Sequence, residues 1–367
     1  MATPPLQGVR VISLAEQYPG PYATLLLSDL GADVIMVERP GSGDPARRFE
    51  GLFASFCRGK RSVVLDLKSA QGHQDFLQLI DGADVVIEGF RPGVMDRLQL
   101  GERQLLERRP DLIYVSISAF GQTGPMAQVV GHDLSIQASL GMLNVPIGGE
   151  SRRDVPMLPM ADIASAMFAA IGVVSALFAR QQGAKGQRID VAMFDSLMSW
   201  MTPFLVPPAN GLPTRTLPPL DPGYGIFLTR DQQQITLSIA GEDAMWNALC
   251  HLLGLTEYAS LNEQQREARA LEIDIPLRRQ LALWDYAPLY KALEEKGIAF
   301  GPVVALSQVA QLPQVQARQM MRSDPQSKDS QTYVGQPLQF NHGIFDLKTG
   351  VPALGEHNEQ LMRPKAP

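Results

Sequence analysis

The sequence predicts an α/β protein in which a large, doubly wound and mostly parallel sheet is joined to a smaller α+β domain. Two observations support this prediction. Short β-branched runs alternate with helical segments through the first 200 residues, which is typical of βαβ units. Near residue 200 this pattern gives way to a stretch rich in proline and glycine, after which helices predominate.

Five short apolar runs are expected to form the strands of the large sheet. The first, "VRVISL", has the β-branched composition of a buried strand, and the other four have a similar composition. The five runs occupy residues 9–14, 33–39, 61–67, 83–90 and 112–120.

Helical segments lie between these runs. The segment 21–32, "PYATLLLSDLGA", has Pro21 near its start and a glycine stop at Gly31, which is the usual asymmetry of helix ends. Residues 69–82 and 101–110 are also expected to be helical. Strand and helix alternating at this interval predict βαβ units.

The domain organisation is expected to be discontinuous. Residues 1–200 form the first part of the large domain, and 201–225, with its many prolines and glycines, is predicted to be a linker. A small α+β domain follows over 226–310, and 311–335 is a second linker. The strand-like and turn-rich segment 336–367 is expected to return to the large domain.

Composition limits the function classes. The chain has 367 residues, 45% hydrophobic, with a net charge of -6, which gives no support for binding nucleic acid. Its two cysteines are far apart and lack metal-type spacing, so a reducing compartment and no metal site are expected. The start does not resemble a signal peptide, and the longest apolar stretch, 167–179, is too short for a bilayer. A cytoplasmic protein without a membrane partner is therefore expected.

Cations lie just beyond the predicted strands. No G-x-G-x-x-G or P-loop motif follows the first strand, although a doubly wound sheet provides a crevice at its strand ends. The cations suit either a solvated surface or a site for a large anionic cofactor, and the residues alone leave both open. They are Arg39, Arg47, Arg48, Arg58, Lys60, Arg61, Lys68, Arg91 and Arg97.

Asp162 and His132 are the candidate catalytic residues. Asp162 precedes an apolar helical run, where it is suited to be an N-cap or, once desolvated, a nucleophile or proton-transfer group. His132 lies in a polar loop after a strand, where the active sites of α/β folds lie but where structural histidines also occur. Spacing alone does not bring these two residues together.

Several motifs in order resemble the family III CoA-transferases, a family that includes formyl-CoA transferase and α-methylacyl-CoA racemase. The N-terminal motifs are "GVRVISLAEQYPGPYATLLLSDLGADVIMVERPGSGD", "RSVVLDLKS" and "ADVVIEGFRPGVMDRLQLG". They are followed by "SISAFGQTGPMAQVVGHD", "PMADIASAMFAAIGVVSALFARQQGAKGQRIDVAMFDS" and "ALGEHNEQL". The resemblance covers nearly the whole chain and is most specific in the first 200 residues.

The resemblance implies a Rossmann-like large domain with a smaller α+β domain, and a homodimer in which two chains interlock. It also implies that the cations bind coenzyme A as part of an acyl-CoA substrate. The residues that match the family's CoA contacts are Gln17, Tyr18, Arg39, Leu65, Lys68, Arg91 and Arg97, with Gln17 and Tyr18 near the thioester.

Asp162 matches the family's catalytic aspartate. In the transferases that carboxylate attacks the acyl-CoA thioester, and the resulting anhydride is converted to an aspartyl-CoA thioester that the acceptor acid intercepts. The resemblance therefore implies transfer of CoA between an acyl-CoA and a small carboxylic acid. Apolar residues at Ile136, Met142 and Met160 are expected to line the acyl site.

Two alternatives remain open at this point. In the racemase the matching aspartate works with a histidine of a "GHD" motif, and His132 stands in such a motif, so an acyl-CoA racemase with His132 and Asp162 as an acid/base pair is possible. In a transferase, His132 is suited to bind the carboxylate or to orient the thioester. A CoA-binding regulator without catalytic activity is the other alternative, and both candidate catalytic residues argue against it.

Overall fold

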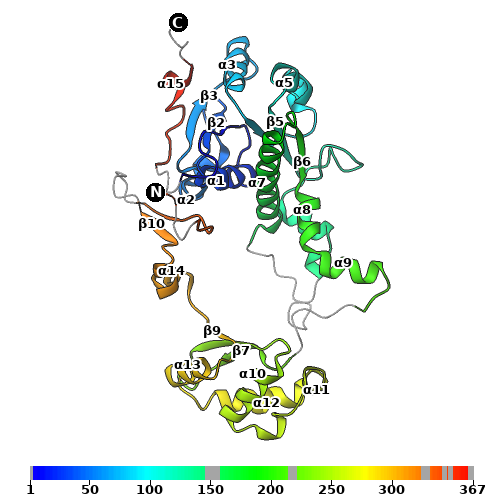
Figure 1. Cartoon of the computed structure of the whole chain (residues 1–367), viewed down its shortest axis with the longest axis vertical. Coiled ribbons are helices and arrows are strands. Elements are labelled where there is room, and N and C mark those ends of the chain that lie inside the picture. The colour runs from blue at the N-terminus through cyan, green and yellow to red at the C-terminus, as the bar shows by residue number, and fades with distance from the viewer. Residues whose placement is uncertain are drawn as a thin grey trace. The chain divides into compact units, whose positions relative to one another are not determined.

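The computed structural model divides the chain into two compact units (Figure 1). Of the described residues, those in 3–144, 158–205 and 313–362 belong to the large unit and those in 206–312 to the small unit. The structure describes residues 3–144, 158–213, 221–323, 331–340, 345 and 350–362.

A six-stranded parallel sheet forms the centre of the large unit. Its strands are β1 (Arg10–Ser13), β2 (Asp33–Glu38), β3 (Arg61–Val64), β4 (Val85–Glu88), β5 (Ile113–Ser118) and β6 (Arg188–Ala192). The order across the sheet is β3-β2-β1-β4-β5-β6, and every pair is parallel. This is the order of the doubly wound dinucleotide-binding fold, with the reversal of direction between β1 and β4. The predicted α/β fold class is confirmed.

Helices cover both faces of the sheet. The helices of this part are α1 (Pro19–Asp29), α2 (Glu50–Cys57), α3 (Ala70–Asp81), α4 (Val94–Arg97), α5 (Glu102–Arg108), α6 (Asp133–Ser139), α7 (Met160–Gln181) and α8 (Met193–Trp200). Alternate side chains of β1 show the two layers: Val11 packs in the cluster with α1 and α7, whereas Ile12 packs with α3, α4 and α5. Both faces are buried, which explains why these strands are continuous apolar runs.

The end of the chain covers the edge of the sheet at β3. In α15 (Asn358–Met362), the Asn358 side chain accepts a hydrogen bond from the Val64 N–H at 2.9 Å and donates to the Val64 carbonyl at 3.0 Å. The N–H of His357 donates to the Ser62 carbonyl. These bonds satisfy the free edge of β3 as another strand would.

A buried arginine attaches a second C-terminal piece to the large unit. Strands β10 (Met321–Ser323) and β11 (Thr332–Val334) form an antiparallel pair. Arg58, almost fully buried, donates to both carboxylate oxygens of Asp29 and to the Val334 carbonyl.

The small unit is an α+β body with its own core. Its three antiparallel strands are β7 (Tyr224–Leu228), β8 (Gln234–Ser238) and β9 (Phe300–Pro302). Its helices are α10 (Asp243–Leu253), α11 (Glu263–Ala268), α12 (Ala270–Leu281) and α13 (Tyr286–Glu295). Trp246, fully buried, lies in the core between the sheet and these helices and donates its indole N–H to the Tyr258 carbonyl.

The two predicted linkers contain regular structure. Residues 201–225 include α9 (Thr202–Ala209) and the start of β7, whereas residues 214–220 lie outside the described part. Residues 311–335 include α14 (Pro313–Ala317), β10 and β11, and residues 324–330 lie outside it. A high content of proline therefore does not exclude a short helix: Pro203 stands in the first turn of α9, where proline fits well, and Pro207 and Pro208 stand in its last turn.

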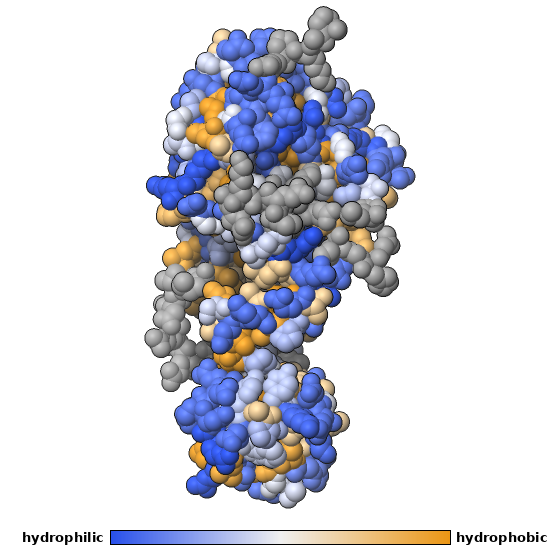
Figure 2. Space-filling view, turned by 90° about the vertical axis from the view of Figure 1, so that its left-hand side faces the viewer, coloured by the Kyte–Doolittle hydropathy of each residue, from blue (hydrophilic) through white to orange (hydrophobic). Residues whose placement is uncertain are grey.

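Helix α7 is longer than the predicted apolar stretch and is not buried on every face. Its 22 residues make it, among the described helices, the one long and apolar enough to cross a bilayer, and half of its most apolar window is buried. Its buried side packs against α1, β5 and β6, as a core helix of a globular domain does. On the face of the molecule in Figure 2, hydrophilic residues predominate and apolar residues form separate patches.

Candidate active site

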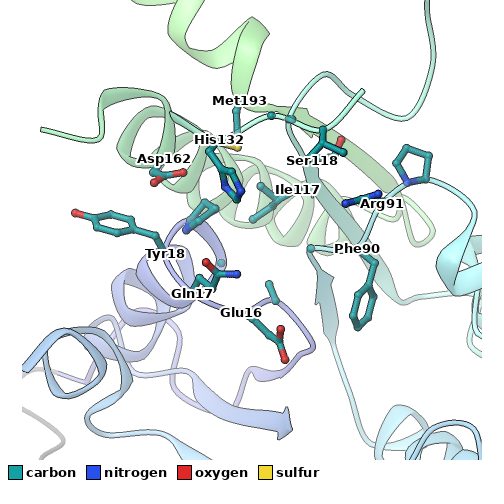
Figure 3. Close-up of a pocket in the computed structure, with 18 of the residues that line it drawn as sticks. Glu16, Gln17, Tyr18, Phe90, Arg91, Ile117, Ser118, His132, Asp162 and Met193 are labelled. Carbon is teal, nitrogen blue, oxygen red and sulfur yellow. The ribbon is translucent and has the colours of Figure 1, made fainter. Parts of the chain in front are cut away.

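The candidate active site lies in the large unit at the carboxyl ends of the strands, where the strand order reverses between β1 and β4. Loops that follow strands on either side of such a reversal separate and leave a crevice. A pocket of about 320 Å³, here called the Asp162 pocket, lies at this place (Figure 3). Its lining residues are 15–20, 89–92, 117–119, 127, 129–132, 162 and 193.

A second pocket adjoins the first along the same edge of the sheet. This Arg39 pocket has a volume of about 470 Å³ and is built from the ends of β1, β2 and β3 and from α4. It shares Glu16 and Phe90 with the Asp162 pocket. Its lining residues are 14, 16, 37–40, 65–68, 90, 94, 97 and 98.

The first turn of α7 places Asp162 in its pocket. The helix begins at Met160 with Pro159 at the N-cap position, so Asp162 is the third residue of the helix and not its cap. The N-cap interpretation of Asp162 is therefore wrong. Burial, and secondarily the nearby Asp133 carboxylate, raise the pKa of Asp162 from 3.8 to about 7.

Asp133 supplies the cap that α7 lacks. Its Oδ1 accepts hydrogen bonds from the N–H groups of Ala161, at 2.6 Å, and Asp162, at 3.4 Å. Its Oδ2 accepts from the side-chain amide of the fully buried Gln137 at 2.5 Å. Asp133 was not predicted from the sequence, although it stands beside His132 in the "GHD" motif and aspartate is a preferred capping residue.

His132 directs its side chain into the same pocket from the N-cap position of α6 (Figure 3). Its backbone N–H donates to Ser135 Oγ, and that hydroxyl donates to the His132 carbonyl, so the residue is held by its main chain. Among the described residues its imidazole has no hydrogen-bond partner in the structure. The structure thus brings His132 and Asp162 to one pocket, where spacing alone could not.

Gln17 has an unusual backbone conformation at the edge of the Asp162 pocket. Its φ of 68° lies in the left-handed region, which is uncommon for a residue other than glycine. The buried Asp44 carboxylate accepts from the Gln17 N–H with both oxygens at 3.2 Å, and the Asp44 N–H donates to Glu38 Oε2 at 2.9 Å. Burial is the largest cause that raises the pKa of Asp44. Asp44, like Asp133, supports the pocket without lining it and was not expected from the sequence.

Tyr18 lies between Gln17 and the start of α1 and lines the Asp162 pocket (Figure 3). Burial raises the pKa of its hydroxyl, and the negative charge of Asp162 contributes to this increase. The hydroxyl therefore stays protonated at neutral pH and is available as a hydrogen-bond donor.

The predicted CoA contacts divide between the two pockets. Arg39, Leu65, Lys68 and Arg97 line the Arg39 pocket, whereas Arg91, Gln17 and Tyr18 line the Asp162 pocket. The Arg39 guanidinium is half exposed and lies 3.9 Å from Glu16. Within the described part of the chain, the side chains of Lys68, Arg91 and Arg97 have no ion-pair partner. Cations of this kind are suited to bind phosphate groups.

Other cations are held in structural ion pairs or hydrogen bonds. Arg47 donates to both oxygens of Glu38, and Arg58 to both oxygens of Asp29. Lys60 is buried and donates to the Pro21 carbonyl and to Thr24 Oγ1, both at 2.8 Å. In the described residues no group of three His, Cys, Asp or Glu side chains is arranged to hold a metal ion.

The predicted apolar lining is wrong. Ile136, Met142 and Met160 pack together in a core cluster with α8 and do not line the Asp162 pocket. The apolar part of that lining comes instead from Ile117, Ala119, Val129, Val130 and Met193. Ile136 is fully buried and packs in that cluster against Ala161 of α7 and Leu197 of α8, so it is not available to the pocket.

Comparison with known proteins gives results that agree with this geometry. Residues 6–358 match the model of CoA-transferase family III. The acetyl-CoA:oxalate CoA-transferase of Acetobacter aceti is 34% identical over 339 residues, which cover 86% of this chain and 85% of that protein. A CAIB/BAIF family protein from Brucella suis has a similar crystal structure, with a TM-score of 0.86 and 30% identity, over 98% of this chain and 99% of the other.

A partial match connects the chain with a racemase. The alpha-methylacyl-CoA racemase of Mus musculus is 41% identical over 202 residues, which cover 54% of this chain and 50% of that enzyme.

Proposed function

The chain belongs to CoA-transferase family III, and we propose that it moves coenzyme A from an acyl-CoA thioester to a carboxylic acid through a covalent intermediate on Asp162. The observation that carries this proposal is a carboxylate of raised pKa in a strand-end pocket that adjoins a cationic pocket. Coenzyme A is an extended molecule with phosphates at one end and a thiol at the other, which suits two adjoining pockets of this kind.

The Arg39 pocket is suited to the nucleotide end of coenzyme A. Arg39, Lys68 and Arg97 offer three cations for its phosphates, and Leu65, Val94 and Leu98 offer an apolar wall for the adenine. The Asp162 pocket, whose lining includes Arg91, then receives the thioester. Glu16 and Phe90, which belong to both pockets, mark the passage between them.

The proposed chemistry begins with attack by an Asp162 carboxylate oxygen on the thioester carbonyl. The C–S bond breaks, CoA leaves as a thiolate, and the acyl group is held as a mixed anhydride on Asp162. The thiolate then attacks the Asp162 carbonyl carbon, so that the donor acid leaves as a carboxylate and an aspartyl-CoA thioester remains.

The acceptor acid completes the exchange by the same steps in reverse order. Its carboxylate attacks the aspartyl thioester carbonyl. This attack forms a second anhydride, between the acceptor and Asp162, and releases the CoA thiolate. The thiolate attacks the acceptor's carbonyl carbon, and the new acyl-CoA leaves while Asp162 is regenerated as a carboxylate. Gln17, Tyr18 and His132 line this pocket and can donate hydrogen bonds to the oxyanion of each tetrahedral intermediate, His132 through whichever ring nitrogen carries a proton.

A racemase is the second candidate, because His132 and Asp162 line one pocket. In that reaction one of the two removes the proton from the carbon next to the thioester and the other returns a proton to the opposite face. The partial identity to the mouse racemase favours this alternative over the other chemistries that an aspartate and a histidine can perform.

One experiment separates the two candidates. The protein is incubated in D2O with a 2-methylacyl-CoA and a panel of small acids that includes oxalate, and the products are analysed by mass spectrometry. We expect new acyl-CoA thioesters of the acceptor acids and no deuterium at the α-carbon of the 2-methylacyl group. Asp162→Ala abolishes their formation, whereas Asp195→Ala, an exposed carboxylate on the neighbouring α8, leaves it unchanged.

Other outcomes of this experiment contradict the proposal. Rapid α-deuteration without transfer to any acid assigns the racemase reaction. Binding of CoA in calorimetry with neither reaction assigns a CoA-binding regulator.

A further inference from the structure

Helix α7 begins without a capping side chain of its own. Pro159 occupies its N-cap position and has no side-chain acceptor, so the first N–H groups of the helix need partners from elsewhere. Asp133, which lies 28 residues earlier in the chain, accepts from Ala161 at 2.6 Å and from Asp162 at 3.4 Å. The turn that carries Asp162 is therefore fixed by a carboxylate from α6.

Asp133 is itself held rigidly. It is the first residue of α6, and its second oxygen accepts a 2.5 Å hydrogen bond from Gln137, one turn later in the same helix. Gln137 is fully buried and also approaches the Leu158 carbonyl at 3.3 Å, so it links α6 to the residues just before α7. The neighbouring residue His132 lines the pocket, and Asp133 does not.

From this geometry we propose that Asp133 is the positioning residue of Asp162: it caps α7 from outside and places a negative charge beside the reacting carboxylate. The inference rests on the proposed function, because it assumes that Asp162 is the group that reacts. It assigns the two polar residues of the "GHD" motif to different tasks, with His132 directed at the substrate and Asp133 at the helix.

The charge has a consequence for titration. The titratable groups that face Asp162 are Tyr18 at the start of α1 and His132 and Asp133 at the start of α6. Helix α8 also packs on α7, but its Asp195 is exposed. Tyr18 is uncharged at neutral pH, so the Asp133 carboxylate is the negative charge that opposes ionisation of Asp162. If that charge is removed, the pKa of Asp162 falls.

Two substitutions separate the cap from the charge. Asp133→Asn is neutral but keeps an acceptor oxygen for the Ala161 N–H. Gln137 Oε1 has no hydrogen-bond partner in the structure, and when the Gln137 amide turns over, this oxygen can accept from the new amide at position 133. Asp133→Ala removes both the cap and the charge. Asp190→Asn is the matched control, since Asp190 holds the Gln122 N–H in the same way but is not among the groups that influence Asp162.

Two measurements are made on each variant: hydrogen–deuterium exchange of the peptide that contains Ala161 and Asp162, and the pH dependence of acyl-adduct formation. Asp133→Ala should speed exchange by roughly fivefold and slow adduct formation by roughly 10- to 100-fold. Asp133→Asn should leave exchange nearly unchanged and move the pH midpoint of adduct formation to lower pH by roughly one unit. Asp190→Asn should change neither.

The two failures are distinguishable. If exchange at the start of α7 is the same in Asp133→Ala as in the wild type, or if Asp133→Asn leaves the pH midpoint in place, the positioning role is refuted while the transferase assignment stands. If the wild type forms no adduct at any pH, the proposed function fails, and the exchange measurement still decides whether Asp133 caps α7.

Discussion

Asp162 is partly buried, and if it reacts as proposed this burial has a measurable effect on catalysis. Attack on the thioester requires the carboxylate form, and burial together with Asp133 raises the pKa of Asp162 to about 7. The value of kcat/KM, which reports the free enzyme, should therefore rise with pH and level off above about 7. Initial rates between pH 5 and 9 test this prediction. A rate that is already constant at pH 5 contradicts it.

The same residue should reduce stability. A carboxyl group whose pKa is higher in the folded than in the unfolded chain costs free energy once the pH exceeds the unfolded value near 3.8, and the cost grows until about pH 7. Asp162→Asn removes this cost, so it should raise the melting temperature at pH 8 more than at pH 4. Calorimetry at both pH values tests this expectation. Equal increases at the two pH values are the contrary result.

Gln17 depends on Asp44 for its conformation. The left-handed backbone of a non-glycine residue costs about 1 kcal/mol or more, and the Asp44 carboxylate compensates for it by accepting from the Gln17 N–H. Asp44→Ala should therefore lower kcat/KM by roughly tenfold in the wild type. It should have a smaller effect in Gln17→Gly, because glycine adopts this conformation freely. A double-mutant cycle measures the difference, and equal effects in both backgrounds contradict the prediction.

The sequence indicates the residues proposed to touch substrate better than the residues that support them. Asp162, His132 and the cations have side chains that can react or bind anions wherever they stand. The motifs around them indicated which of these residues belong to one site. Asp133 and Asp44 act through hydrogen bonds to backbone groups far along the chain, and no local pattern predicts such a contact. The orientation of Ile136 was also predicted wrongly, because it depends on where α6 begins.

At the scale of elements, strands were easier to predict than short helices. The five predicted runs all contain a strand, because strands buried on both faces are continuous apolar runs. Strand β6 was missed because its residues, "RIDVA", alternate with charge at an edge of the sheet, where one side stays exposed. Helix α6 was missed because its seven residues show no long apolar period.

The exposed side of helix α7 predicts that the chain forms a dimer. An apolar stripe of the helix is exposed in the single chain, with Ile171 at 56% and Phe178 at 63% exposure, and Met167, Phe168 and Val174 also belong to it. Such a stripe is typical of an interface, and we expect a second copy of the chain to cover it in a homodimer.

Sedimentation at low micromolar concentration tests the homodimer. The wild type should sediment as a dimer, and Ile171→Asp should lower the dimer fraction, because a charge buried in the interface is costly. Glu107→Lys, an exposed change on α5, should not. A monomeric wild type contradicts the prediction, as does a variant with Ile171→Asp that remains fully dimeric.

At the scale of the whole molecule, the two units differ in what they contain. The large unit holds both pockets, and residues far apart in the sequence complete it, since Asn358 binds Val64 and Arg58 binds the Val334 carbonyl. Periodicity predicted the strands and the change of pattern near residue 200. It did not predict the short helices and strands within the predicted linkers, because elements of three to eight residues show too little periodicity.

The central claim is that an Asp162 carboxylate becomes acylated, and trapping that intermediate tests it most directly. The protein is incubated with acyl-CoA in the absence of an acceptor acid, treated with neutral hydroxylamine and digested, and the peptide that contains Asp162 is analysed by tandem mass spectrometry. The account predicts a hydroxamate on Asp162, seen as the mass of one added NH group, and none on Asp133 or Asp195. An unmodified Asp162 peptide from protein that transfers CoA normally would contradict the account.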